Sequence, residues 1–150
     1  MEIVTPNNEY FVLKSEISTR NANFLRELSD QSLTVTEHIR RATAFYHLAM
    51  RVYENGGSIY SLLDQESEII PLFDPGRDSE NALDRVMLSV NLNVETAKVL
   101  QDLGVSEESS ETSVLDNVLH HYCKAVEKSK NGQKIIVDYS NGVKNELLFI

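Results

Sequence analysis

Two stretches of the chain, residues 11–17 and residues 86–92, have side chains that alternate in the manner of a β-strand. One face of each stretch is mainly apolar and carries leucine and isoleucine in the first stretch, and leucine and valine in the second. This face is expected to point into a core. The opposite face is expected to point outward and carries Val12, Lys14 and Glu16 in the first stretch, and Met87, Ser89 and Asn91 in the second.

Each strand is followed by a short segment with helical spacing of its apolar residues. Ser18 or Thr19 precedes the first segment and Asn93 precedes the second, and all three are residue types that favour helix starts. The sequence therefore predicts two short amphipathic helices. Their buried stripes contain Ala22, Leu25 and Leu28 in one case, and Ala97, Leu100 and Leu103 in the other.

A longer helix is predicted after each short one. Thr34 and Glu37 belong to the sequence TVTE, the pattern of a capping box, and Ser110 stands at the corresponding place in the second half. Each long helix is expected to end at a glycine, Gly56 or Gly132. The expected buried stripes are Ile39, Ala42, Tyr46, Ala49 and Tyr53 in the first helix, and Leu115, Val118, Tyr122 and Val126 in the second.

Extended segments close each half. Residues 59–63 and 69–73 flank a polar turn, and residues 135–139 and 143–150 flank Asn141-Gly142, a dipeptide typical of hairpin turns. Each half is therefore expected to end in a small β-hairpin.

The two halves are similar in sequence as well as in pattern. When the second half is shifted onto the first by 75 positions, and by 76 after the loop that follows the short helix, 12 positions are identical. They are Leu13, Ala22, Leu25, Leu28, Thr36, Tyr46, Ala49, Asn55, Gly56, Ile59, Leu72 and Phe73, aligned with Leu88, Ala97, Leu100, Leu103, Thr112, Tyr122, Ala125, Asn131, Gly132, Ile135, Leu148 and Phe149. The one-residue slip falls where loops are expected, between residues 29 and 33 and between residues 104 and 109.

This repeat predicts an α+β fold made of two tandem units. An N-terminal arm of residues 1–9 precedes the first unit at residues 10–73, and a linker rich in Pro, Gly, Ser and Asn at residues 74–84 precedes the second at residues 85–150. A single strand with one apolar face cannot make a stable core alone, so the two strands are expected to pair with each other within the chain.

Charge narrows the range of partners. The chain has 14 basic and 23 acidic side chains, a net charge of −9, which opposes broad electrostatic attraction to nucleic acid or to anionic lipid. It contains no run of about 18 apolar residues and no signal-like start, so neither membrane insertion nor export is expected, and we place the protein in the cytoplasm. The single cysteine, Cys123, cannot form an internal disulfide and agrees with that compartment.

A strand, a short helix, a loop and a capped longer helix, with SVNL at residues 89–92 and NGQKIIVDYSNGVKNELLF at residues 131–149, resemble the ribbon-helix-helix family of DNA-binding repressors. The resemblance is closest to bacterial members with an added C-terminal hairpin. It implies that the two strands form an antiparallel ribbon that enters the major groove of double-stranded DNA. Because one chain holds both units, the resemblance implies an intramolecular pseudo-dimer and a transcriptional regulator, expected to be a repressor.

Carried over by position, the base-reading residues of the family fall on Lys14, Glu16, Ser89 and Asn91. The family's phosphate contacts, made by backbone amides at the start of the second helix, fall on Thr34, Val35 and Thr36 and on Ser110, and Arg40 and Arg41 lie just downstream. In the second unit the corresponding turn reads SEESSE, and its three carboxylates would repel a phosphate.

Metal binding and catalysis find little support in the sequence. His120 and Cys123 are three residues apart and could share a helix face, but two ligands do not make a site and no second cluster stands nearby. Gly56-Gly57 lacks the Lys-Ser/Thr of a phosphate-binding loop and is explained by a helix end. We therefore expect no metal, no cofactor and no enzymatic activity.

Two hypotheses from different classes remain. In the first, the chain is a sequence-specific regulator whose unequal ribbon strands read a site that need not be palindromic. In the second, an acidic interaction module or inhibitor has lost DNA binding and contacts a basic protein partner, which the net charge and the acidic residues 107–111 favour. A continuous positive surface that joins Lys14, Arg20, Arg40 and Arg41 across the ribbon would favour the first; a homodimer is compatible with both.

Overall fold

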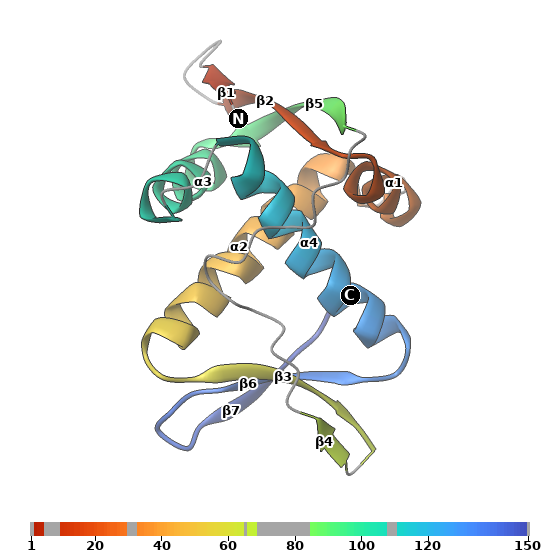
Figure 1. The fold of residues 1–150 in the computed structure, drawn as a ribbon, viewed down its shortest axis with the longest axis vertical. Coiled ribbons are helices and arrows are strands. Elements are labelled where there is room, and N and C mark those ends of the chain that lie inside the picture. Colours follow the sequence, from red (N-terminus) through yellow and green to blue (C-terminus); the bar gives the residue numbers. More distant parts are fainter. Residues whose placement is uncertain are drawn as a thin grey trace.

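The computed structural model describes residues 2–4, 10–29, 33–64, 66–68, 85–107 and 111–149. Within these residues the fold is α+β, with four helices and two antiparallel sheets. Figure 1 shows three layers: one sheet at the top, the helices beneath it with the two longer ones crossing, and the second sheet at the bottom. Among the described helices, none is both long enough and apolar enough to cross a membrane.

The upper sheet contains the two strands that the alternating patterns predict. Strand β2 (Tyr10–Ser18) pairs antiparallel with β5 (Arg85–Asn93) along its whole length, so the expected pairing of these segments is confirmed. A third strand, β1 (Glu2–Val4), pairs with the other edge of β2 and gives the order β1-β2-β5. This strand was not predicted, because three residues carry too little pattern to indicate a strand.

The register places equivalent residues of the two halves opposite each other. Lys14 pairs with Ser89, and these two positions are related by the 75-residue shift of the repeat. In the lower sheet Tyr60 pairs with Ile136, and these are related by the 76-residue shift. A twofold axis that passes through both sheets would produce this arrangement.

The two short helices start where the sequence predicts. Helix α1 (Thr19–Leu28) begins after Ser18, whose Oγ accepts a hydrogen bond of 3.2 Å from the backbone N–H three residues later. Helix α3 (Val94–Glu107) begins after Asn93, whose Oδ1 accepts the equivalent bond at 2.8 Å. These bonds satisfy amide groups that a helix start otherwise leaves without a partner.

Helix α3 is longer than expected. We predicted a loop between residues 104 and 109, but the helix continues through Gly104 and ends at Glu107. Glycine in a helix costs only about 1 kcal/mol relative to alanine, so a single glycine is a poor signal for a helix end. Residues 108–110, including Ser110, lie outside the described part of the chain.

The two long helices, α2 (Val35–Glu54) and α4 (Glu111–Lys130), cross beneath the upper sheet (Figure 1). Thr34 caps α2, with its side chain accepting a hydrogen bond of 3.3 Å from the third N–H of the helix, as the sequence predicts. Both helices are followed by a glycine with positive φ, 83° at Gly56 and 87° at Gly132, which only glycine adopts without strain.

The lower sheet joins both hairpins. Its strands are β3 (Ser58–Leu63), β4 (Glu66–Glu68), β6 (Lys134–Asp138) and β7 (Lys144–Leu147), in the order β4-β3-β6-β7. The sequence predicts two separate hairpins, whereas the β3–β6 pairing makes them one sheet.

The first hairpin also differs in its return strand. We expected residues 69–73 to pair with residues 59–63, but β4 forms from residues that we assigned to the turn. The chain reverses at Asp64, whose φ of 55° is one that aspartate tolerates better than most residues. Residues 69–73 lie outside the described part of the chain. The second hairpin forms around Gly142, as predicted, although β7 ends before residue 148.

Both halves contribute to one core. Tyr46 and Tyr122 are 2% and 3% exposed, which confirms that these equivalent residues are core positions, whereas Tyr53, expected in the stripe, is 50% exposed. Other side chains that are almost fully buried come from all layers, and they include Leu13, Leu25, Ile39, Leu92, Leu100, Leu115 and Ile135.

Candidate nucleic-acid interface

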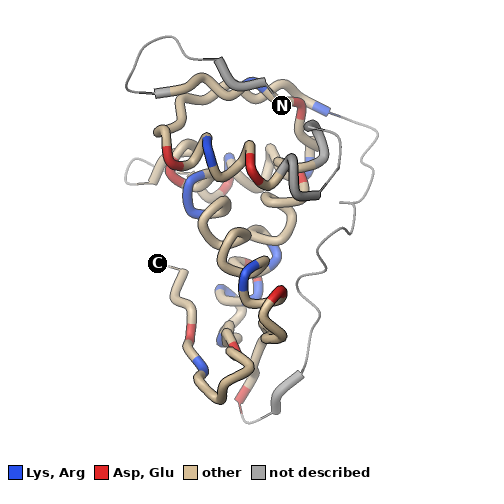
Figure 2. The backbone as a smooth tube through the Cα atoms, turned by 90° about the vertical axis from the view of Figure 1, so that its left-hand side faces the viewer, with Lys and Arg blue, Asp and Glu red and all other residues tan. Residues whose placement is uncertain are grey.

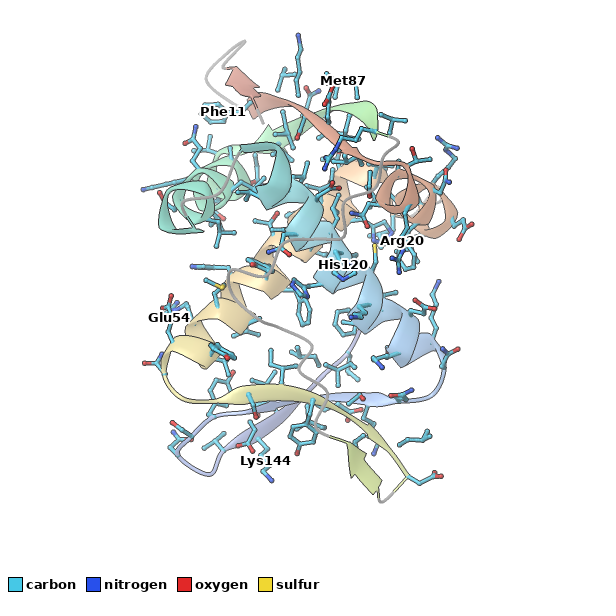
Figure 3. All side chains as sticks on the ribbon, viewed as in Figure 1. Phe11, Arg20, Glu54, Met87, His120 and Lys144 are labelled. Carbon is cyan, nitrogen blue, oxygen red and sulfur yellow. The ribbon has the colours of Figure 1, made fainter. Side chains whose placement is uncertain are left out.

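The outer face of the β2–β5 ribbon is the surface on which the base-reading candidates meet. Lys14, Glu16, Ser89 and Asn91 are all exposed. Met87 is 66% exposed, and Figure 3 shows it at the top of the molecule, on the side of the ribbon away from the helices. The alternation of the two strands has therefore brought the four candidates onto one face.

The register sets which candidates are neighbours. Lys14 lies directly opposite Ser89, and Glu16 lies opposite Met87. Directly opposed side chains in an antiparallel pair have Cβ atoms about 5 Å apart, so each can reach its cross-strand neighbour. One ammonium donor, one carboxylate acceptor, and a hydroxyl and an amide that can both donate and accept thus share a narrow strip.

Strand β1 changes the shape of this strip. It pairs along the edge of β2, with Glu2 opposite Lys14 and Val4 opposite Val12. Three adjacent strands span about 10 Å between the outer backbones, compared with about 5 Å for a two-stranded ribbon. The face is therefore widest beside Lys14. Because the DNA major groove is about 12 Å wide, a three-stranded face leaves little clearance in the groove there.

The candidates for phosphate contact lie at the start of α2. Thr34 is exposed, and Val35 and Thr36 are half-buried. The side chain of Thr34 is occupied by the capping bond, which leaves the backbone amides of the first turn as the groups that an anion could approach.

Arg40 and Arg41, the candidate cations near that turn, both contact Glu37. The Arg40 guanidinium donates to both carboxylate oxygens of Glu37, with Nε–O distances of 2.9 and 3.0 Å and a further short contact from its Nη2. The Arg41 Nε lies 3.8 Å from the same carboxylate. The hydrogen bond from Arg40 lowers the pKa of Glu37, so this carboxylate stays ionised and offsets part of the positive charge.

The described basic candidates belong to different elements: Lys14 to β2, Arg20 to α1, and Arg40 and Arg41 to α2. Lys14 points outward from the top sheet, whereas Arg20 lies below it on α1, close enough to Cys123 to lower the pKa of that thiol in opposition to burial. Acidic and basic positions are interspersed from the upper sheet down to the lower one (Figure 2).

Asp116 on α4 holds one end of the ribbon, a role that sequence reasoning missed. Its carboxylate is 1% exposed and accepts hydrogen bonds from the Ser18 backbone N–H at 2.9 Å and from Asn21 Nδ2 at 2.9 Å. Arg85 completes the cluster with a salt bridge of 3.0 Å. A buried carboxylate with three donors is well satisfied, so this cluster fixes the register of α4 against both strands.

The two equivalent core tyrosines are each bound by the long helix of the other half. The Tyr122 hydroxyl lies 2.9 Å from Nδ1 of His38, and Asn117 Nδ2 donates to the Tyr46 hydroxyl at 2.8 Å. The other ring nitrogen of His38 lies 3.2 Å from the carbonyl of Leu28, which can only accept, so Nδ1 accepts from the tyrosine when the ring is neutral. His38 was not singled out by the sequence.

Of the two residues considered for metal binding, Cys123 is buried and His120 is half-buried. Cys123 is 7% exposed, and burial raises the pKa of its thiol to about 12, which keeps it protonated at neutral pH. Among the described residues, no group of three or more His, Cys, Asp or Glu side chains is arranged to hold a metal ion.

Comparison with known proteins found no counterpart: no protein-family model, curated protein or solved structure matches the chain.

Proposed function

We propose that the chain consists of two tandem ribbon-helix-helix units, closed into an intramolecular pseudo-dimer, and that it is a DNA-binding regulator. The observation that supports this most is the register of β2 and β5, which pairs Lys14 with its equivalent Ser89. That register turns the polar faces of both strands to the same side, away from the helices, as reading of the major groove requires.

The proposed reading is asymmetric. Lys14 donates to guanine O6 or N7, and Asn91 bonds the edge of adenine in both directions. Ser89 can donate or accept, whereas Glu16 can only accept and would select the amino group of cytosine. Because Lys14 and Ser89 occupy equivalent positions but differ in chemistry, the site should not be palindromic.

Phosphate contacts are proposed at the first turn of α2, through the backbone amides that follow Thr34, with Arg41 nearby. Arg40 would have to exchange its bonds to Glu37 for a phosphate, so we expect its contribution to be smaller than a free arginine would make. The corresponding turn of the second unit is acidic, so binding should rest on the first.

The test is selection of bound fragments from random duplex DNA, followed by affinity measurements across a salt series. We expect a motif to be enriched, and a salt slope below about 4 because few phosphates are neutralised. Asn91→Ala should relax the preference at one base pair, at a cost of about 1–3 kcal/mol for the preferred base, and Lys14→Ala should relax another.

A matched control is Lys144→Ala, which removes an exposed lysine from the lower sheet, far from the ribbon (Figure 3). It should leave the motif and the affinity unchanged. The ribbon mechanism fails if the double variant Lys14→Ala, Asn91→Ala selects the same motif with the same affinity as the natural chain.

A second function, an acidic module that binds a basic protein partner, is favoured by two specific observations. Strand β1 widens the face beside Lys14, and Glu37 offsets the charges of Arg40 and Arg41. If no DNA is bound even at about 20 mM salt, the interaction module becomes the better proposal, since weak electrostatic binding is strongest at low salt.

A further inference from the structure

A cavity of about 590 Å³ lies between α2, the start of α3 and the turn that joins β6 to β7. Arg40, His47 and Arg51 line it from α2, and Asn93 and Thr96 line it from the first turn of α3. Its volume falls in the range of small-molecule sites, which is about 300–1,000 Å³. Arg40 is also a candidate for phosphate contact, but none of the four base-reading candidates lines this cavity.

The cavity belongs to one end of the molecule, and the repeat explains its size. Val99 and Ala44 line it, and the equivalent positions in the other half carry Phe24 and His120. Phe24 is half-buried and packs against the core. The other end of the molecule therefore has two larger side chains at the positions where the cavity end has two small ones. The small side chains leave space open beside α2.

The two ends of the molecule also differ in the charge of equivalent residues. Arg40 and Arg51 line the cavity, whereas the equivalent positions of α4 carry Asp116 and Glu127. Arg40 already bonds Glu37, but Arg51 forms no ion pair with another described residue. Glu95, the one acidic residue among the described residues that line the cavity, offsets one of these two positive charges.

The first turn of α3 adds to this local positive character. Asn93 and Thr96 both line the cavity, so the first turn of the helix, which carries partial positive charge, borders it. The wall formed by α2 also has apolar residues, Leu48 and Val52, next to its arginines. In a chain of net charge −9, this combination of cations, helix start and apolar wall is suited to an anion with an apolar body.

We propose that this cavity is a binding site for a small organic anion, a carboxylate or phosphate monoester that carries an apolar group. Arg51 binds the anionic group together with the start of α3, and Leu48, Val52 and Val99 contact the apolar group. This inference does not depend on DNA binding, because the cavity lies below the ribbon and excludes its base-reading residues.

The experiment is calorimetric titration of the full chain with phenyl phosphate, which has both required parts. Phenol, which has the ring without the charge, and inorganic phosphate, which has the charge without the ring, are the comparison probes. We expect one phenyl phosphate per chain, bound at least tenfold more tightly than either comparison probe. Absence of phenyl phosphate binding at millimolar concentration, or equal affinity for inorganic phosphate, would overturn the proposal.

Three variants place the site. Arg51→Gln should weaken phenyl phosphate binding at least fivefold, whereas Arg26→Gln, which removes an exposed arginine from α1, should leave it unchanged. Val99→Phe introduces the side chain that the other half carries at the equivalent position and should abolish binding by filling the cavity. The circular dichroism spectrum and urea midpoint of each variant establish that it folds.

Equal weakening by Arg51→Gln and Arg26→Gln would assign binding to diffuse surface charge and contradict the proposal. Unchanged binding by a folded Val99→Phe would place the ligand elsewhere, with the same consequence. If Val99→Phe does not fold, Val99→Leu replaces it, with a smaller loss of at least threefold expected.

Discussion

The two ends of the β2–β5 ribbon are equivalent in the repeat but are held in different ways. At the end where Ser18 faces Arg85, Asp116 is buried and bonds both strands and helix α1. At the end where Tyr10 faces Asn93, the position equivalent to Asp116 is Arg40, which is exposed and bonds its own helix. One end is thus closed by a buried ionic cluster, and the other end borders an open cavity.

The difference shows where two halves of similar sequence can differ in structure. The turn after the long helix keeps the same backbone bond in both halves: Gly57 N–H bonds the Val52 carbonyl at 2.8 Å, and the equivalent Gln133 N–H bonds the Lys128 carbonyl at 3.1 Å. Side chains that fill the space between helices are not the same. Hydrogen-bonded helix ends define the path of the chain, whereas interhelical side chains can change if each end still satisfies its buried groups.

The largest effect is expected from removing the cluster that only one end has. Asp116→Ala leaves Arg85, the Ser18 N–H and Asn21 without their shared acceptor and should lower the free energy of unfolding by about 3–5 kcal/mol. Arg40→Ala, at the equivalent position, should cost about 0.5 kcal/mol because its salt bridge is exposed. Urea unfolding measures both, and similar losses would contradict the contrast drawn between the two ends.

A smaller effect is expected at the turn after α2, where Gly57 has no side chain and the equivalent residue of the other half is Gln133. A Cβ added at Gly57 would lie 2.5 Å from the Asp138 carbonyl oxygen and 2.7 Å from Cγ1 of Val52. Gly57→Ala should therefore destabilise the fold by about 1–3 kcal/mol through overpacking. Gln133→Ala, the equivalent substitution, should change stability by less than about 0.5 kcal/mol, as most surface substitutions do. A neutral Gly57→Ala in thermal unfolding would show that β6 does not pack closely against this turn.

The smallest effect at neutral pH is expected from the ionisation of Cys123, which changes stability only in alkaline solution; its equivalent in α2 is the exposed His47. Burial raises the pKa of the folded thiol from 9.0 to about 12. Between these values the unfolded chain binds fewer protons than the folded one, so stability falls as the pH rises, by at most about 1.4 kcal/mol per pH unit. Below about pH 8 the thiol is protonated in both states and contributes almost no slope.

Cys123→Ala should remove this contribution. The stability gap between the natural chain and the variant should therefore narrow from about pH 8 upward, as measured by urea unfolding at a series of pH values. Val126→Ala, which shortens another buried side chain of α4 without removing a titratable group, should keep a constant gap. A Cys123→Ala gap that stays constant through pH 11 would mean that the thiol ionises alike in both states.

The elements with local signals were predictable from the sequence. Alternation placed the paired strands around Lys14 and Ser89, capping residues placed the starts of α1, α2 and α3, and glycines marked the ends of the long helices. These features depend on a residue and its close neighbours in the chain. The common outward direction of the four base-reading candidates follows from the same alternation.

The features that the sequence did not predict depend on distant partners. In the sequence, Asp116 cannot be distinguished from other acidic helix residues. Its role depends on the backbone N–H of Ser18, which lies 98 positions away in the chain and bonds its carboxylate in the fold. His38 is buried and contacts Tyr122 from the other half of the chain. The cavity is open because Val99, which lines it, has a small side chain. Strand β1 is too short to have a pattern. In each case the deciding interaction lies between segments that only the folded chain brings together.

The pairing of Lys14 with Ser89 has a consequence for how such a chain could be assembled from separate parts. Two copies of the first half, related by the same axis, would set Lys14 against Lys14, and like charges directly opposite one another are unfavourable. Two copies of the second half would set serine against serine, without that repulsion. Separately expressed halves should therefore associate with each other more readily than the first half associates with itself, whereas the second half keeps the ability to pair with its own copy.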